Sequence, residues 1–439
     1  MDRRYFLSSA ALSAVGAALT ACGGGGSESS VLGGAESSSL SNSMTSALSN
    51  TIKSRVIVIG GGMAGATVAK YLRLWGDGIA VTLVERMPTY TSNIMSSMVL
   101  TGQRSMSSLT FKYDTLRSKY GITTVFGDVV AIDPVGVTVT LADKTVLKAD
   151  RIVMAPGISF DDVPGLGTSD KMPHAWQAGP QTTLLAKQLA AMPSRGVVVL
   201  TIPKTPYRCP PGPYERACLI ADWLKVKKPG SKLIVLDANS DIVTEKDNFS
   251  SAFLGLHGGV IEYHNNAEVT RVDPATMSIF TTAGTIQGNV INMIPRQSAG
   301  ALVAKAGLNN ATEGRFAGVD VLSYASTVSS ASKVHIIGDS SATTQPKAGH
   351  IANQEAKVCA DAISRILSGG SPDPVPVTNS ACYSTITMSQ ASWLTAVFKY
   401  NGSAMAPVAG SSAASIGWNS DSFEEMSKWF NALMADSFA

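Results

Sequence analysis

The chain has 439 residues, of which 45% are apolar and 15% charged, and its formal net charge is only +3. This composition supports a large buried core and excludes global disorder, and the charge gives no indication of a nucleic-acid partner. After residue 22 no apolar run approaches the roughly 20 residues of a membrane span. The five cysteines include no Cys-x-x-Cys pair, which argues against a structural zinc site and a c-type haem.

The first 51 residues have the composition of an export signal and a linker. Arg3-Arg4 before an Ala-rich apolar stretch resembles a twin-arginine signal, and residues 19–22 (Leu-Thr-Ala-Cys) resemble a bacterial lipobox. We therefore expect a signal over residues 1–22, export to the periplasm, and membrane contact only through a lipid anchor at Cys22. The alternative is a plain signal peptide cleaved near Ala21. The Gly- and Ser-rich residues 23–51 are expected to form a flexible linker.

A glycine-rich turn follows the first predicted strand, a β-branched run over residues 55–59. The turn has the spacing G-x-G-x-x-G, and a helix over 66–74 and a strand over 80–84 come after it. An acid follows 20 residues after the last glycine. In dinucleotide-binding units such glycines let the backbone approach a pyrophosphate, and the acid accepts hydrogen bonds from a ribose. The candidate cofactor residues here are Gly60, Gly62, Ala64, Gly65, Glu85 and Arg86.

Two later segments favour FAD over NAD. Residues 151–157 form a strand ending in a small-residue turn with Ala155 and Gly157, which resembles the crossover segment of flavoproteins with two dinucleotide domains. Residues 334–339 form a strand ending in Gly338-Asp339, which resembles the motif whose Asp binds the ribityl chain of the flavin. The alternative for Asp339 is a helix cap. Because the three motifs keep the order of those flavoproteins, FAD is the predicted cofactor.

A second strand–helix–strand pattern occupies residues 197–202, 214–226 and 233–236. Its turn, residues 203–213, contains four prolines and one glycine after Lys204. Such a turn cannot give the close backbone approach that a pyrophosphate needs. We therefore predict a nicotinamide-type domain that has lost its nucleotide site.

Four cysteines lie outside the predicted signal, and the sequence leaves their pairing open. Cys218 and Cys359 fall in helical, apolar patterns and are predicted to be buried thiols. Cys209 lies between Arg208 and a predicted helix start, and both features lower the pKa of a thiol. Cys382 lies in a segment predicted to be a polar loop, residues 379–384. A purely structural bridge between Cys209 and Cys382 is the alternative to a reactive pair.

Residues 207–217 (Tyr-Arg-Cys-Pro-Pro-Gly-Pro-Tyr-Glu-Arg-Ala) closely resemble the central motif of the flavoprotein subunit of flavocytochrome c sulfide dehydrogenase. Residues 381–384, 346–354 and 417–439 are similar to later segments of that family. The resemblance implies an α/β fold with two Rossmann-like dinucleotide-binding domains of the glutathione reductase type and a smaller C-terminal α+β domain. The implied divisions are FAD-binding segments at 52–160 and 291–370, a second dinucleotide-like domain at 161–290, and a cytochrome-facing domain at 371–439.

The same resemblance implies a reaction. Cys209 and Cys382 would form a redox-active disulfide that hydrosulfide attacks, and electrons would pass through FAD to a separate c-type cytochrome. Lys347 would lie near the flavin pyrimidine. Many family members attach FAD through a cysteine where this chain has Asn93, so the FAD is expected to be non-covalent.

Three other functions remain open at this level. A sulfide:quinone oxidoreductase would need an apolar C-terminal helix pair, which the acids of residues 421–436 supply poorly. An NADH-linked disulfide or persulfide reductase is disfavoured by the proline-rich turn. A non-catalytic flavin-binding partner of a sulfur-oxidation complex is disfavoured by the two retained cysteines.

Overall fold

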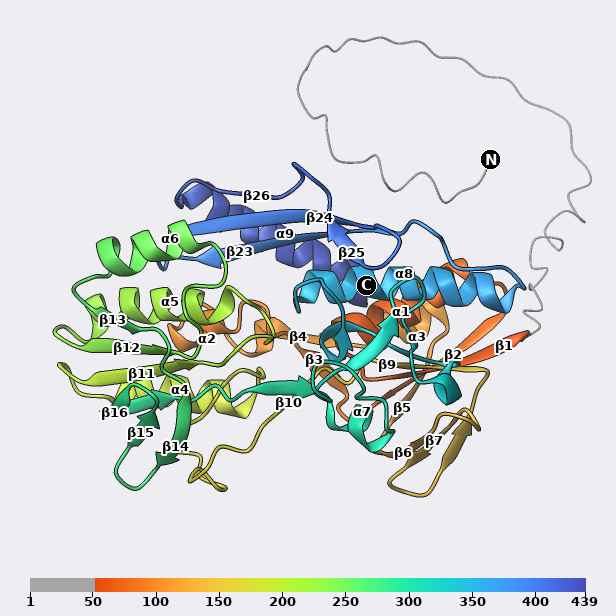
Figure 1. Cartoon of the computed structure of the whole chain (residues 1–439), viewed down its shortest axis with the longest axis horizontal. Coiled ribbons are helices and arrows are strands. Elements are labelled where there is room, and N and C mark those ends of the chain that lie inside the picture. The colour runs from red at the N-terminus through yellow and green to blue at the C-terminus, as the bar shows by residue number, and fades with distance from the viewer. Residues whose placement is uncertain (1–51) are drawn as a thin grey trace, which may run out of the picture. The chain divides into compact units, whose positions relative to one another are not determined.

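The computed structural model describes residues 52–439, which belong to one compact unit (Figure 1). The predictions for the signal over residues 1–22, the anchor at Cys22 and the linker over 23–51 lie outside the described residues. Among residues 52–439, no helix combines the length and apolar character that crossing a bilayer requires.

The first sheet begins as the sequence predicts. β1 (Ser54–Ile59) pairs in parallel with β2 (Ile79–Glu85) on one side and with β9 (Arg151–Met154) on the other. α1 (Met63–Trp75) begins three residues earlier than predicted, because the Ala66 N–H already donates to the Gly62 carbonyl oxygen at 2.9 Å. The glycine turn is therefore short, and the first turn of α1 starts directly behind it.

This sheet has eight strands in all, in the order β22-β19-β20-β21-β9-β1-β2-β5. The remaining members are β5 (Thr123–Phe126), β19 (Ala317–Asp320), β20 (Ala325–Ser326), β21 (Val334–Ile336) and β22 (Ser341–Ala342). One face packs against α1 and α8 (Gly349–Leu367), with α3 (Asp114–Tyr120) beside α1. The other face packs against α7 (Ala301–Lys305) and the small sheet β6 (Val129–Asp133), β7 (Thr138–Leu141) and β8 (Val146–Lys148). Both faces are thus covered, as the apolar strand sequences require.

A second sheet has four parallel strands in the order β13-β12-β11-β17. These are β11 (Val197–Ile202), β12 (Lys232–Asp237), β13 (Ile261–His264) and β17 (Val290–Asn292), with the helices α4 (Pro180–Ala191), α5 (Gly212–Lys227) and α6 (Lys246–Ser251). A three-stranded sheet of β14 (Val269–Asp273), β15 (Ser278–Thr281) and β16 (Gly284–Gln287) packs beside it. The predicted strand–helix–strand unit is confirmed.

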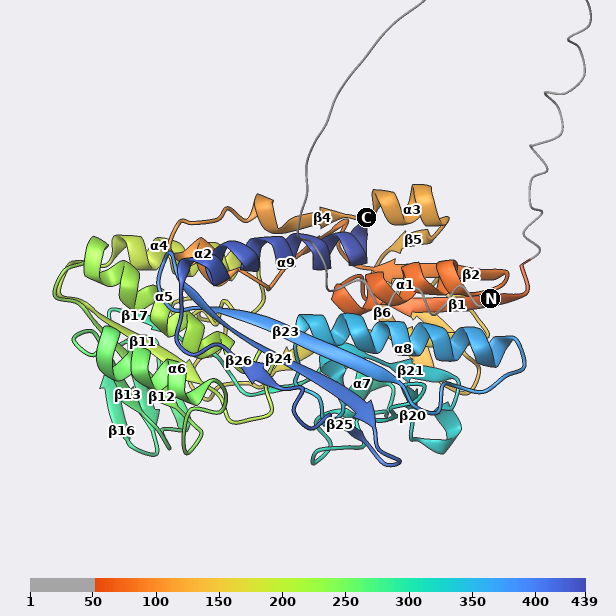
Figure 2. The same ribbon diagram turned by 90° about the horizontal axis from the view of Figure 1, so that it is seen from above.

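The last part of the chain is a β-sheet with one long helix. It contains β23 (Val377–Thr385), β24 (Ala391–Tyr400), β25 (Met405–Pro407), β26 (Ala413–Ala414) and α9 (Ser420–Phe438). β23 packs against both α8 and α5, and Figure 2 shows it running from one region to the other. Short elements join the parts: β3 (Thr89–Thr91), β4 (Thr110–Lys112), α2 (Ser97–Leu100), β10 (Ile158–Phe160) and β18 (Gln297–Ala299).

The prediction that Cys382 lies in a polar loop is wrong, because Cys382 lies within β23, opposite Leu394 of β24. The polar residues that suggested a loop are satisfied inside the strand. The Ser384 hydroxyl, for example, is fully buried and donates to the Glu245 carboxylate at 2.6 Å. A polar strand of this kind is stable because its hydroxyls have buried acceptors.

Candidate functional site

The glycine turn after β1 forms a close-packed cradle. Gly60 has φ +95°, a region that glycine adopts without strain, and a Cβ there would lie 2.4 Å from the Ala155 carbonyl oxygen. A Cβ on Gly65 would lie 1.7 Å from the Gly60 carbonyl oxygen. The turn, the first residues of α1 and the end of β9 therefore meet at a separation that only glycines permit.

Glu85 faces this cradle from the end of β2. Its Oε2 accepts a hydrogen bond from the Gly61 N–H at 2.6 Å, and its Oε1 accepts from the N–H groups of Arg86 and Met87 at 2.8 and 3.0 Å. The guanidinium of Arg86 is exposed and lies 3.4 Å from Asp128. The structure thus brings the Glu85 carboxylate to the glycine turn and directs Arg86 away from it.

The crossover segment and the Gly-Asp motif converge on the same place. A Cβ on Gly338, whose φ is +70°, would lie 3.2 Å from the Cβ of Ala64. The Gly157 carbonyl oxygen accepts a hydrogen bond from the Ser340 hydroxyl at 2.5 Å. The three motifs recognised along the sequence therefore form one site at the carboxyl ends of β1, β9 and β21, where open α/β sheets bind ligands.

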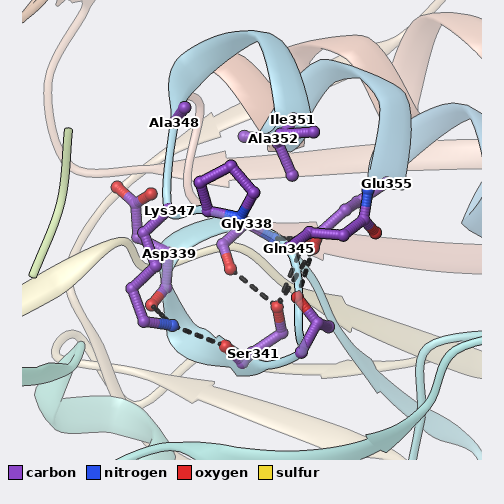
Figure 3. A pocket seen from close by; sticks show the side chains of 11 residues that line it. Gly338, Asp339, Ser341, Gln345, Lys347, Ala348, Ile351, Ala352 and Glu355 are labelled. Atoms are coloured by element: carbon purple, nitrogen blue, oxygen red, sulfur yellow. Dashed lines mark hydrogen bonds between the residues drawn. The ribbon is translucent and has the colours of Figure 1, made fainter. Parts of the chain in front are cut away.

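Lys347 is held by the turn that carries Asp339. Its Nζ donates to the carbonyl oxygens of Asp339 and Ser341 at 3.0 and 2.6 Å (Figure 3). The same Nζ lies 3.9 Å from the centre of the Phe316 ring. Burial lowers the pKa of Lys347, and the nearby carboxylates of Asp339 and Glu355 oppose that shift. Lys347 thus places a positive charge against the Gly338–Ser341 turn.

The segments that carry Cys209 and Cys382 are both hydrogen-bonded to residues at the start of α8. The backbone N–H of Cys209 donates to the Lys347 carbonyl oxygen at 2.6 Å, two residues before α8. The N–H of Ala381, the neighbour of Cys382, donates to His350 Nδ1 in the first turn of α8 at 2.9 Å. Although they are far apart in the sequence, the two thiols are near enough that a charge on Cys382 raises the pKa of Cys209.

Two half-buried carboxylates that were not among the predicted site residues flank the cysteine pair. Glu215, in the first turn of α5, accepts a hydrogen bond from the Thr385 hydroxyl at 2.9 Å. Glu245 accepts from the hydroxyls of Ser384 and Ser392, both at 2.6 Å. Burial raises the pKa of Glu215 to about 7. Glu215 lies six residues after Cys209 in the sequence, and this proximity is the signal that could have indicated it. No local pattern marks Glu245.

The predicted lowering of the Cys209 pKa is wrong. Burial raises the pKa of Cys209, the negative charges of Cys382 and Glu215 raise it further, and the positive charge of Arg208 does not outweigh them. Burial also raises the pKa of Cys382 to about 12, and Glu245 adds to that shift. The four described cysteines are free thiols in this structure, so the disulfide between Cys209 and Cys382 stays a prediction. Cys218 and Cys359 are buried in α5 and α8, as expected.

In the second βαβ unit, which consists of β11, α5 and β12, the acid at the end of β12 is buried away from solvent. Asp237 is fully buried, and its Oδ2 accepts hydrogen bonds from the hydroxyls of Tyr214 and Tyr263 at 2.7 and 2.8 Å. Its Oδ1 accepts from the backbone and the side chain of Asn239 at 2.9 and 2.8 Å. The carboxylate that would bind a ribose in a nicotinamide domain therefore has all its acceptor positions filled by protein.

The residues around the first βαβ unit, which consists of β1, α1 and β2, have the geometry and the unpaired polar groups expected of an FAD site. The cradle is closed to any side chain at Gly65, and the carboxylate of Asp339 makes no hydrogen bond within the described part of the chain. The Nη2 of Arg208 is buried there without a hydrogen-bond partner. Burial raises the pKa of Asp339, and the positive charges of Arg208 and Lys347 oppose that shift. These are the unpaired groups that a polar cofactor would satisfy.

Family comparisons agree with this site. The family of the sulfide dehydrogenase [flavocytochrome c] flavoprotein chain, central, matches residues 182–295. The flavocytochrome c sulphide dehydrogenase, flavin-binding, family matches residues 374–438, and pyridine nucleotide-disulphide oxidoreductase matches residues 54–199. These matches cover parts of both βαβ units and the last sheet.

Two curated proteins are similar in sequence over parts of the chain. The sulfide dehydrogenase [flavocytochrome c] flavoprotein chain of Chlorobaculum thiosulfatiphilum is 47% identical over 45 residues, which are 94% of that sequence and 10% of this chain. A probable ferredoxin reductase of Castellaniella defragrans is 38% identical over 106 residues, which are 24% of this chain and only 26% of the reductase.

Solved structures share the fold at low identity. The sulfide:quinone oxidoreductase of Aquifex aeolicus has a TM-score of 0.72 and 17% identity, over 87% of this chain and 91% of that one. An NAD-dependent persulfide reductase of A. fulgidus has a TM-score of 0.59 and 14% identity, over 87% of this chain and 77% of that one. The fold is thus that of a flavoprotein with two Rossmann-type domains. FAD is its cofactor, and the chain belongs to the family of the flavocytochrome c sulfide dehydrogenase flavoprotein chain.

Proposed function

We propose that this flavoprotein oxidoreductase oxidises sulfide at Cys209 and Cys382 and passes the electrons through FAD to a separate c-type cytochrome. The observation that carries the proposal is the meeting of these two cysteines at the start of α8, directly beside Lys347 and the Gly338-Asp339 motif. Both thiols are half-buried, which leaves room for a small sulfur nucleophile and little for a large substrate.

The first step is thiol–disulfide exchange on the oxidised pair. Hydrosulfide attacks one sulfur of the Cys209–Cys382 disulfide, so a new S–S bond forms a cysteine persulfide and the other cysteine leaves as a thiolate. The positive charge of Arg208 favours the thiolate at Cys209, since it acts to lower that pKa against burial.

The second step removes the sulfane sulfur and reforms the disulfide. A second hydrosulfide takes the outer sulfur as HSS⁻ and leaves a thiol beside the thiolate. Closing the disulfide then releases one proton and two electrons, so that two HS⁻ give HSS⁻, H⁺ and two electrons overall. FAD, when bound, supplies the two-electron acceptor. Glu215 is suited to receive the proton, since its pKa of about 7 lets it be largely ionised just above neutral pH.

FAD is proposed to be held without a covalent bond. Asn93 occupies the position of the attachment cysteine, and its Oδ1 accepts a hydrogen bond from the Ala178 N–H at 2.7 Å. An amide in that place cannot form a thioether. The cytochrome partner is proposed from the family alone, and the periplasmic location with a lipid anchor at Cys22 from the sequence alone.

The test is an anaerobic titration of the purified protein with sulfide, following the flavin band near 450 nm. We expect bleaching in the wild type and in Cys218→Ala, a control that removes a buried thiol of α5 outside the pair. Cys209→Ser and Cys382→Ser should each leave the flavin oxidised. Bleaching of both serine variants at the wild-type rate would refute the disulfide relay, and bleaching by NADH instead of sulfide would favour a reductase.

The acceptor is tested in the same preparation. After reduction by sulfide, oxidised cytochrome c or a soluble quinone is added, and the return of the 450 nm band is timed. Rapid reoxidation by cytochrome c supports the proposal. Reoxidation by the quinone alone would assign the chain the activity named for its Aquifex aeolicus structural neighbour.

A further inference from the structure

Another carboxylate, which is fully buried, lies on α8 against the Gly-Asp turn (Figure 3). Glu355 is only 1% exposed. Its Oε2 accepts a hydrogen bond from the Gly338 N–H at 2.7 Å and lies 3.2 Å from the Ser341 hydroxyl, and its Oε1 lies 3.3 Å from the Thr343 hydroxyl. All three partners belong to the turn that presents Asp339, so Glu355 fixes the position of that turn from behind.

The charged groups around Glu355 leave it without a direct ion pair. Among the described residues no Lys, Arg or His nitrogen lies within 4 Å of its carboxylate; the ammonium of Lys347 is the nearby positive charge and donates to carbonyl oxygens instead. Asp339 contributes a negative charge from the same turn. Burial raises the pKa of both Tyr324 and Cys359, and the negative charge of nearby Glu355 adds to each shift.

The titratable groups of α1 and β23, which pack against α8, make their hydrogen bonds to groups other than Glu355. On α1, Tyr71 donates to Asp436 of α9 and Lys70 to carbonyl oxygens of the same helix. On β23, the hydroxyl of Tyr383 lies 3.4 Å from Glu425. Burial therefore dominates the electrostatics of Glu355 and raises its pKa to about 7, with Lys347 and the hydrogen bonds opposing the shift.

We propose that Glu355 is a positioning residue for FAD, holding the Gly338–Thr343 turn in place and taking up one proton from solvent when FAD binds. The pyrophosphate of FAD brings negative charge to the first βαβ unit, and the bound cofactor covers the turn from water. Both effects disfavour the carboxylate relative to the acid. The acid can still accept from the Gly338 N–H through one oxygen, while its O–H donates to the Ser341 or Thr343 hydroxyl.

This inference rests on FAD binding and is independent of sulfide chemistry. Because binding and protonation are linked, FAD should bind the apoprotein more tightly as the pH falls through the neutral range. The dissociation constant should rise by up to about tenfold for each pH unit between the pKa values of Glu355 in the free and the FAD-bound protein. A Gln at this position keeps an acceptor and gains donors, so it mimics the protonated acid and removes the dependence.

The experiment is calorimetric titration of apoprotein with FAD between pH 5.5 and 8.5, in buffers of different ionisation enthalpy. We expect the wild type to take up as much as about three-quarters of a proton near pH 7.5, because part of Glu355 is already protonated there. Glu355→Gln should lack this contribution to the uptake. The matched control is Asp237→Asn, which removes a buried carboxyl with a raised pKa from the second βαβ unit and should keep the wild-type uptake. Equal uptake in wild type and Glu355→Gln would overturn the proposal. If Glu355→Gln does not fold, absence of proton uptake by the wild type alone would overturn it.

Discussion

The two βαβ units of this chain have the same backbone arrangement and different chemistry. In each, two strands pair in parallel over six residues, β1 with β2 and β11 with β12. Each second strand ends in an acid, Glu85 or Asp237. The first unit turns through glycines into α1, whereas the second turns through prolines and Cys209 into α5.

The turn, and not the βαβ frame, decides whether a nucleotide site exists. In the first unit, Glu85 binds N–H groups at the turn itself and remains half-exposed beside the cradle. In the second, Asp237 is closed off by two tyrosine hydroxyls and Asn239. Cys209 occupies the turn where the phosphates of a second nucleotide would lie, and its backbone N–H donates to the Lys347 carbonyl oxygen beside the flavin site.

The largest effect is expected from Gly65→Ala. Its methyl group would lie 1.7 Å from the Gly60 carbonyl oxygen, so the turn must open and the FAD cradle is destroyed. We expect purified Gly65→Ala to contain no FAD and to unfold at a markedly lower temperature, as measured by the flavin absorbance and a thermal melt.

Gly62→Ala is the matched control for that prediction. Its φ is −72°, and a Cβ there would meet only the Tyr90 ring, at 3.7 Å. This variant should fold normally and bind FAD more weakly, because the methyl group holds the backbone away from the pyrophosphate. Full FAD occupancy in Gly65→Ala would contradict the assignment of the first unit as the cofactor site.

Asp237→Ala should reduce stability without changing cofactor use. Removal of the carboxylate leaves two tyrosine hydroxyls without their acceptor, and each unsatisfied buried group costs roughly 1–3 kcal/mol, about 4 kcal/mol together. Urea denaturation measures the loss. NADH should not raise the melting temperature of the wild type or of the variant; a rise in the wild type would mean that the second unit still binds a nucleotide.

Glu215→Gln should change how stability depends on pH. With a pKa near 7 in the folded protein and 4.5 as its ordinary value, Glu215 binds a proton in the native state that the unfolded chain releases. It therefore lowers the free energy of unfolding as the pH rises from about 4.5 to 7, by at most about 3 kcal/mol. Urea denaturation across this range should show a smaller fall in Glu215→Gln. The exposed Glu268→Gln is the control and should keep the wild-type slope; equal slopes in all three proteins would contradict the burial argument.

The sequence predicts the first unit well because its signals are local. β-branched runs mark β1 and β2, and the glycine spacing follows from contacts among neighbours in the chain. The second unit was also predictable as strands and a helix. The proline-rich turn also predicts that this unit has lost its nucleotide site, since proline chemistry acts on the residues next to it.

The meeting of the cysteines and the charges around them could not be predicted in the same way. Cys382 reaches the site because β23 crosses from α8 to α5, a long-range packing that leaves no periodic mark in the sequence. The polar residues of β23 looked like a loop because their buried acceptor, Glu245, lies far away in the chain. The sign of the Cys209 pKa shift was wrong for the same reason: Arg208 and the helix start are visible locally, and burial is not.

The smallest effect, a modest loss of FAD affinity, is expected from the substitution of Glu85. It tests whether the acid of the first unit contributes to binding. Glu85→Gln keeps acceptor oxygen for the turn but loses the charge that favours a ribose diol. Loss of one charge-assisted hydrogen bond corresponds to about 1.4 kcal/mol, or roughly tenfold weaker FAD binding. Fluorescence titration of the apoprotein measures the dissociation constant, with a thermal melt to confirm the fold.

Arg86→Ala separates this effect from a general disturbance of the strand end. Arg86 follows Glu85 directly, yet its side chain is exposed and directed at Asp128, 3.4 Å away. Exposed ion pairs contribute little, so this variant should bind FAD within about twofold of the wild type. If Arg86→Ala weakened FAD as much as Glu85→Gln, the strand end as a whole would set the affinity. The contrast between a half-exposed acid in the first unit and a sequestered acid in the second would then no longer explain the difference in nucleotide binding that we predict between them.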